Sequence, residues 1–141
     1  MLSKSLGVLV ALAGAGHATA DCGTYFNSDH VYHVIDTGMG TLSEYLNHWT
    51  AANSSYVITY MNGTAQQTGT CKCTLQSDGS YGTVCTAEGP GIPAGSMGSM
   101  RTYDLPESAG GVFSCYNFGD KAEVPKTCEG AANFNFAKKI A

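Results

Sequence analysis

The sequence has few charged residues and very little positive charge. Only 13% of its 141 residues are charged, and 7 Lys and Arg stand against 11 Asp and Glu. Arg101 is the single arginine, and the one basic pair, Lys138-Lys139, lies near the end of the chain. Nucleic-acid backbones are bound by clustered basic side chains. We therefore expect no nucleic-acid partner.

The sequence also lacks the short motifs of common catalytic sites. It contains no Gly-x-Ser-x-Gly elbow, no His-Glu-x-x-His pair and no phosphate-binding loop. Cys71-Lys72-Cys73 is the only Cys-x-Cys motif, and a thiol-based metal cluster would need more. From motifs we predict no catalytic residue, no metal site and no cofactor.

Beyond its first residues the chain has no long hydrophobic run. A membrane-spanning helix needs about 20 apolar residues, so we expect no membrane span. At the start, Lys4 precedes an apolar stretch at residues 6–13, and Ala18-Thr19-Ala20 has small residues at the spacing of a cleavage site. This arrangement predicts a secretory signal peptide over residues 1–20 and a single extracellular domain over residues 21–141.

Six cysteines follow this leader, and their number is even. In an oxidising compartment three disulfides are the expectation. The six residues are Cys22, Cys71, Cys73, Cys85, Cys115 and Cys128. In a strand, Cys71 and Cys73 point to one face. Spacing alone leaves the pairing open.

The turn after Cys73 offers two registers. A three-residue Ser77-Asp78-Gly79 loop would place Cys71 opposite Cys85. A two-residue Asp78-Gly79 loop would turn Cys85 to the other face, and we favour it because Asp-Gly is typical of tight hairpin turns.

The pattern of apolar residues predicts a mixed fold. Strands are expected at residues 30–36, 55–61, 70–76, 81–87 and 111–118, and a last strand near residues 132–136 with Phe134 and Phe136 buried. Thr41 and Glu44 have the spacing of a capping box, and an apolar stripe follows, which predicts a helix over residues 42–52. The expected fold is α+β, an antiparallel sheet of four or five strands with one packed helix.

Residues 88–110 show no periodicity and contain three prolines. Irregular stretches of this length are either functional or disordered, so a binding loop and a mobile surface loop are both open. If the stretch binds a partner, the candidate binding residues are Met97, Met100, Arg101 and Tyr103.

Two sequons predict surface asparagines that can carry glycans. They are Asn53-Ser54-Ser55 and Asn62-Gly63-Thr64. Glu44 and His48 would lie four apart on the predicted helix, as an acid–base pair or as a surface contact.

The short leader, the even cysteine count and the Gly-, Ser-, Thr- and Asn-rich body resemble the small cysteine-rich secreted proteins of filamentous fungi. Residues 21–27 and 69–71 are similar to necrosis-inducing effectors of the Ecp2 type. Many of the fungal proteins are effectors or toxin-like virulence factors. The resemblance therefore implies a secreted effector that binds a host or competitor protein without catalysing a reaction.

Two other functions are open. A carbohydrate-binding module would hold cell-wall polysaccharide on exposed aromatic rings. A secreted ribonuclease-like hydrolase is the enzymatic alternative, because His33, Glu88 and Arg101 follow the chain order of the guanyl-specific fungal ribonucleases. No histidine follows Arg101, so the general acid of that family is missing.

Overall fold

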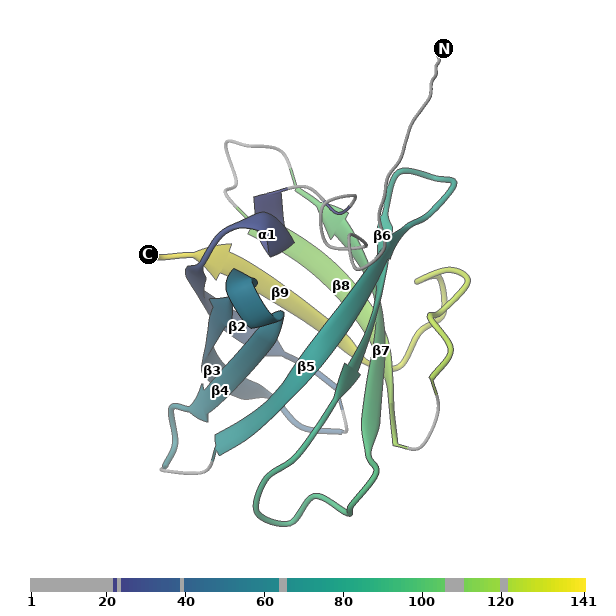
Figure 1. The fold of residues 1–141 in the computed structure, drawn as a ribbon. Helices are drawn as coiled ribbons and strands as arrows, with labels where there is room; N and C mark the ends of the chain where they lie inside the picture. Colours follow the sequence, from purple (N-terminus) through teal and green to yellow (C-terminus); the bar gives the residue numbers. More distant parts are fainter. Residues whose placement is uncertain (1–21, 23, 39, 64–65, 106–110, 120–121) are drawn as a thin grey trace.

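The protein is a closed barrel of eight antiparallel strands, as the computed structural model in Figure 1 shows. The structure describes residues 22, 24–38, 40–63, 66–105, 111–119 and 122–141. The strands are β2 (His30–Asp36), β3 (Ser43–Thr50), β4 (Ser55–Tyr60), β5 (Gln66–Leu75), β6 (Tyr81–Thr86), β7 (Met97–Asp104), β8 (Gly111–Gly119) and β9 (Phe134–Lys139). Each strand pairs with the next along the chain, and β9 pairs with β2 to close the sheet.

Two short helical elements, α1 and η3, accompany the strands in the described part of the chain. Helix α1 (Thr24–Asn27) lies at one end of the barrel, and the 3-10 turn η3 (Ala51–Asn53) joins β3 to β4. The α+β prediction is therefore wrong, and so is the expected count of four or five strands. The predicted leader, residues 1–20, lies outside the described residues. None of the helices in the described part of the chain is long and apolar enough to cross a membrane.

The predicted helix over residues 42–52 is strand β3. Its residues alternate between the two faces of the sheet, and Tyr45 and Trp49 are buried inside the barrel. Leu42, which the helical stripe placed in the core, is 71% exposed. Tyrosine, tryptophan and threonine favour strands, and pairing with β2 and β4 on both sides outweighs a local capping signal.

The remaining strand predictions agree with the structure in position. The predicted strand over residues 30–36 is β2, and the predicted hairpin is formed by β5 and β6. The last strand is present as β9, but the predicted buried face is wrong. Asn135 is buried inside the barrel, whereas Phe136 on the outer face is 50% exposed.

All three expected disulfides are present. They join Cys22 to Cys73, Cys71 to Cys85, and Cys115 to Cys128. Because a disulfide of this kind requires an oxidising environment, the bridges support an oxidising compartment.

The favoured two-residue hairpin register is wrong, because Cys71 and Cys85 are paired and bridged. The three-residue loop wins because Asp78 accepts hydrogen bonds from the backbone and side chain of Ser80, while Gly79 takes the left-handed conformation with φ of 88°.

Residues 88–110 are not one irregular loop. They contain strand β7, and the last five, 106–110, lie outside the described residues. Gly98 and Ser99 pair with β6 and β8 despite their weak strand preference. Among its described residues, the segment between β6 and β7 is a loop, and Figure 1 shows it at the end of the barrel opposite α1.

Candidate functional site

The barrel encloses a cavity of about 390 Å³. All eight strands contribute inward side chains to its wall. This volume lies at the small end of the range for sites that hold small organic molecules. Eight-stranded barrels are either filled by side chains or hold one small ligand, and this one retains internal space.

One end of the barrel is covered by aromatic side chains. Phe26 of α1 packs edge-on against Trp49 of β3, with ring centroids 4.9 Å apart, and its carbonyl accepts a hydrogen bond from the indole nitrogen. The disulfide from Cys22 to the fully buried Cys73 holds the chain leading into α1 against β5. At the other end, Pro90 and Ile92 of the β6–β7 loop line the cavity.

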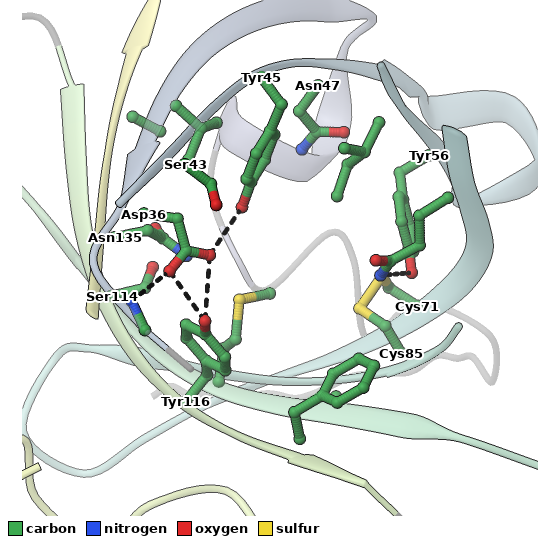
Figure 2. Close-up of a pocket in the computed structure, with 18 of the residues that line it drawn as sticks. Asp36, Ser43, Tyr45, Asn47, Tyr56, Cys71, Cys85, Ser114, Tyr116 and Asn135 are labelled. Carbon is green, nitrogen blue, oxygen red and sulfur yellow. Dashed lines mark hydrogen bonds between the residues drawn. A yellow bond between two sulfur atoms is a disulfide. The ribbon is translucent and has the colours of Figure 1, made fainter. Parts of the chain in front are cut away.

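Asp36, the last residue of β2, is the polar centre of the cavity. Its Oδ1 accepts hydrogen bonds from the Gly38 amide at 2.7 Å and from the Tyr116 hydroxyl at 2.8 Å. Its Oδ2 lies 3.3 Å from the Tyr45 hydroxyl, which also donates to it. Figure 2 shows Tyr45 and Tyr116 on either side of Asp36, with their hydroxyls directed at its carboxylate. Asp36 is the only charged residue among the described ones that line the cavity.

Asp36, Gly38, Tyr45 and Tyr116 form the Asp36 cluster. Its two tyrosines remain protonated over the physiological pH range. Burial raises the pKa of the Tyr116 hydroxyl, and its hydrogen bond to Asp36 raises it further. Burial also raises the pKa of Tyr45, with a smaller contribution from the Asp36 charge. Both hydroxyls are therefore neutral hydrogen-bond donors to the carboxylate.

Gly38 allows Tyr116 to reach Asp36. A Cβ at this position would lie 2.1 Å from the Tyr116 hydroxyl oxygen and 3.0 Å from Cβ of Asn133. No real Cβ contact is that short, so an alanine must push the tyrosine ring away from the carboxylate.

We expect Gly38→Ala to break the Tyr116–Asp36 hydrogen bond and to lower stability by roughly 1–3 kcal/mol, because overpacking and an unpaired acceptor both cost free energy. Urea unfolding measures the loss, and the tyrosine ring signals in NMR report the displacement. Gly63→Ala is the matched control, because a Cβ there meets no atom within 4 Å. Equal stability of the two variants would contradict this role of Gly38.

Other cavity residues present hydrogen-bond acceptors and apolar surface. The buried Oδ1 of Asn47 has no hydrogen-bond partner among the described residues. Gln67 donates from its amide nitrogen to the Tyr56 hydroxyl at 3.1 Å. Val34 and Ile58 supply apolar wall between these groups. The cavity thus combines a mostly apolar surface with a few fixed polar groups, as small-molecule sites do.

A second buried titratable group, His30, lies near α1 in a cluster of aromatic rings. Its ring centroid is 4.6 Å from that of Tyr25 and 4.4 Å from that of Tyr32. Burial lowers the pKa of His30 to about 4, with a smaller lowering by Lys139, while the nearby backbone of Tyr25 and the Asp29 charge act in the opposite direction.

This depressed pKa makes stability fall in mild acid. Between pH 6.5 and pH 4 the unfolded chain binds a proton at His30 that the folded chain does not, so unfolding is favoured as the pH falls. We expect a loss of about 1–2 kcal/mol between pH 7 and pH 5 from this residue. Urea unfolding at both pH values measures it, with His30→Phe as the comparison. If the free energy of unfolding fell equally between pH 7 and pH 5 in the wild type and in His30→Phe, His30 would not be the cause of the acid sensitivity.

The structure places the four candidate binding residues of the predicted loop in different surroundings. Met100 points into the barrel and lines the cavity. Arg101 points outward but is buried, and it contacts Asp78, Ser80 and the Pro125 carbonyl. Tyr103 lies on the outer face, where its hydroxyl donates to Asp78. Met97 is the first residue of β7 and is partly buried.

The residues considered for acid–base chemistry do not form one cluster. His33 lies on the outer face of β2 and hydrogen-bonds Glu44 across the strand pair at 3.0 Å. His48 lies farther along β3, and Glu88 is an exposed residue after β6. Arg101 forms an ion pair with Asp78 on the outer face of β7. The ribonuclease-like hypothesis needs His33, Glu88 and Arg101 close together, and the structure does not bring them together.

Both predicted glycan acceptors are exposed. Asn53 is in the turn between β3 and β4, and Asn62 is in the turn after β4. In the described part of the chain no group of three His, Cys, Asp or Glu side chains could hold a metal ion.

Asp36, Tyr45 and Tyr116 were not among the predicted site residues. The signal that could have found Asp36 is the alternation of β2, in which Tyr32, Val34 and Asp36 share one face. A carboxylate that continues an inward apolar face indicates a site. Tyr45 fell within the apolar stripe of the predicted helix, whereas in the structure it lies on the inner face of β3.

Comparisons with protein-family models, with curated proteins and with solved structures found no match. The fold and the cavity are therefore the basis for any statement about function.

Proposed function

We propose that this protein binds a small organic molecule inside its barrel. The observation that supports this is the cavity of about 390 Å³, which has inward polar groups at fixed positions in an otherwise apolar wall. A core built only for stability would fill this space, because voids cost free energy.

A neutral fluorescent probe tests this proposal. Trp49 is the only tryptophan and lines the cavity, so energy transfer from it to bound N-phenyl-1-naphthylamine reports occupancy. We expect saturable binding of one probe per chain. Absence of saturation, or several equivalent sites, would contradict the proposal.

Two alanine substitutions sharpen this test. Ala137 is buried on the inner face of β9, and Ala137→Phe should fill the cavity and weaken probe binding by at least about tenfold. Ala132 is exposed before β9, and Ala132→Phe should leave binding unchanged. Thermal unfolding of both variants shows whether they fold. Undiminished binding to a folded Ala137→Phe variant would place the probe outside the barrel.

We also propose that the protein acts outside the cell, as the resemblance to small secreted fungal proteins implies. The three disulfides support an oxidising compartment. An effector role against a host or a competitor stays a prediction, and the cavity supplies one way to act, by sequestering a small molecule. Recovery of the protein from culture medium, with a new N-terminus near residue 21, tests secretion.

A second candidate function is polysaccharide binding on the outer face. Tyr103, Phe113 and Phe136 occupy paired positions on three neighbouring strands, and the row continues to Ile35. The ring centroids of Phe113 and Phe136 are 5.0 Å apart. Exposed apolar surface of this kind marks an interaction site, and aromatic faces stack on sugar rings.

Retention on insoluble chitin or β-glucan tests this second function. We expect Phe136→Ala to reduce retention, while Leu75→Ala, an exposed apolar position on β5, leaves it unchanged. Passage of the wild-type protein through both matrices without retention would remove the candidate.

A further inference from the structure

The charge of Asp36 is not neutralised by any described residue that lines the cavity. The three groups that contact it, the Gly38 amide and the Tyr45 and Tyr116 hydroxyls, are neutral donors. Donors therefore contact both oxygens of the carboxylate. The ion pairs found among the described residues involve other groups, on the outside of the barrel.

An unpaired charge in a partly enclosed apolar space is unfavourable, and such groups are normally paired or bind a ligand. Asp36 faces the cavity, and Figure 2 shows open space between it and the far wall near Tyr56. A cation in the cavity could therefore pair with the Asp36 carboxylate. The hydrogen bonds to Asp36 already hold that carboxylate in position.

The walls around Asp36 favour a cation as well. The rings of Tyr45 and Tyr60 meet edge to face with centroids 5.3 Å apart, and both line the cavity with Tyr116. Aromatic faces attract cations, and organic ammonium groups are often bound this way. The Oδ1 of Asn47, which has no hydrogen-bond partner among the described residues, adds a second acceptor for an N–H donor.

The rest of the cavity is suited to an uncharged apolar body. Trp49, Ile58 and Met100 line it beyond the Asp36 cluster. A molecule with a negative group would face Asp36 with no compensating lysine or arginine among the described lining residues.

We propose that the ligand is a small organic amine, whose protonated nitrogen binds the Asp36 carboxylate and whose apolar part packs against the inner wall. This inference rests on the proposed function, because it names the ligand class of the same cavity. Tyr45 and Tyr116 act as positioning residues for the carboxylate.

Three compounds that differ only in their polar group test the inference. They are 2-phenylethylamine, 2-phenylethanol and phenylacetate, titrated calorimetrically at pH 7 into the full disulfide-bonded protein. We expect the amine to bind at least about tenfold more tightly than the alcohol, since a hydrogen bond between charged groups is stronger than one between neutral groups. Phenylacetate should bind most weakly.

The Asp36→Asn variant isolates the charge. With its carbonyl oxygen in the Oδ1 position, asparagine still accepts from Gly38 and Tyr116. Its amide nitrogen then takes the Oδ2 position and can donate to the Tyr45 hydroxyl, so the cluster keeps its contacts without the charge. We expect amine affinity to fall to that of the alcohol, while alcohol and N-phenyl-1-naphthylamine binding are retained. Asp29→Asn is the matched control outside the cavity lining, and it should leave amine affinity unchanged.

The outcomes separate this inference from the proposed function. If amine and alcohol bind equally to the wild type, or if Asp36→Asn leaves the amine preference intact, the amine inference is wrong although the cavity still binds small molecules. If neither these compounds nor the naphthylamine probe binds, both proposals are wrong.

Discussion

Replacing Cys22 and Cys73 together with alanine is expected to lower the free energy of unfolding by about 4 kcal/mol, the largest loss among the three disulfides. The bridge closes the longest loop, with a sequence separation of 51, against 14 and 13 for the other two. A longer loop leaves the unfolded chain more freedom when the bridge is removed. Each shorter bridge is expected to contribute about 3 kcal/mol by the same argument.

The Cys22–Cys73 bridge also secures the covered end of the barrel. The bridge holds the segment that leads into α1, and Phe26 of α1 packs on Trp49. Removing it should loosen this packing and shift the Trp49 fluorescence to longer wavelength. Urea unfolding of the three double-alanine variants gives the ranking. A smaller loss for this pair than for Cys115 and Cys128 would contradict the account.

Replacing Arg101 with alanine is expected to lower the free energy of unfolding by about 2–4 kcal/mol, because a buried cation is removed from several acceptors at once. Arg101 is 8% exposed. Its Nε donates to the Pro125 carbonyl at 2.6 Å, and one terminal nitrogen donates to Ser80 Oγ at 2.7 Å and to Asp78 at 3.2 Å. The side chain therefore joins the β5–β6 turn to the segment between β8 and β9.

This prediction assigns Arg101 a structural role, so its loss should not change ligand selectivity. At a temperature where the variant is folded, its amine-to-alcohol preference should equal that of the wild type. Lys72→Ala removes an exposed positive charge from β5 and serves as the control, with an expected change within about 0.5 kcal/mol. An Arg101→Ala variant that is as stable as this control would show that the contacts contribute little.

The sequence was a good guide to strands with clear alternation and a poor one to how they assemble. The pattern of residues 30–36 located β2 because its β-branched and aromatic residues point to one structure. At β3 the spacing of Tyr45, Leu46 and Trp49 fits a helix as well as a strand, and only pairing with β2 and β4 decides between them.

Closure of the barrel is harder to predict than the strands. It depends on β9 pairing with β2 across more than 90 residues of sequence, and no local pattern encodes such a contact. The polar interior adds to the difficulty, because Asn135 and Asp36 face inward where a sheet packed on a core would carry apolar residues. Because these inward positions are polar, the sequence pattern predicted neither the cavity nor the position of Asp36 inside it.

The position of a bound amine within the protein tests the central claim most directly. Intermolecular nuclear Overhauser effects between 2-phenylethylamine and the isotope-labelled protein would locate it. We predict contacts from the ligand's phenyl protons to the methyl groups of Val34 and Ile58, and from the methylene next to nitrogen to the rings of Tyr45 and Tyr116. Contacts confined to the outer face, for example to Phe136, would contradict the account.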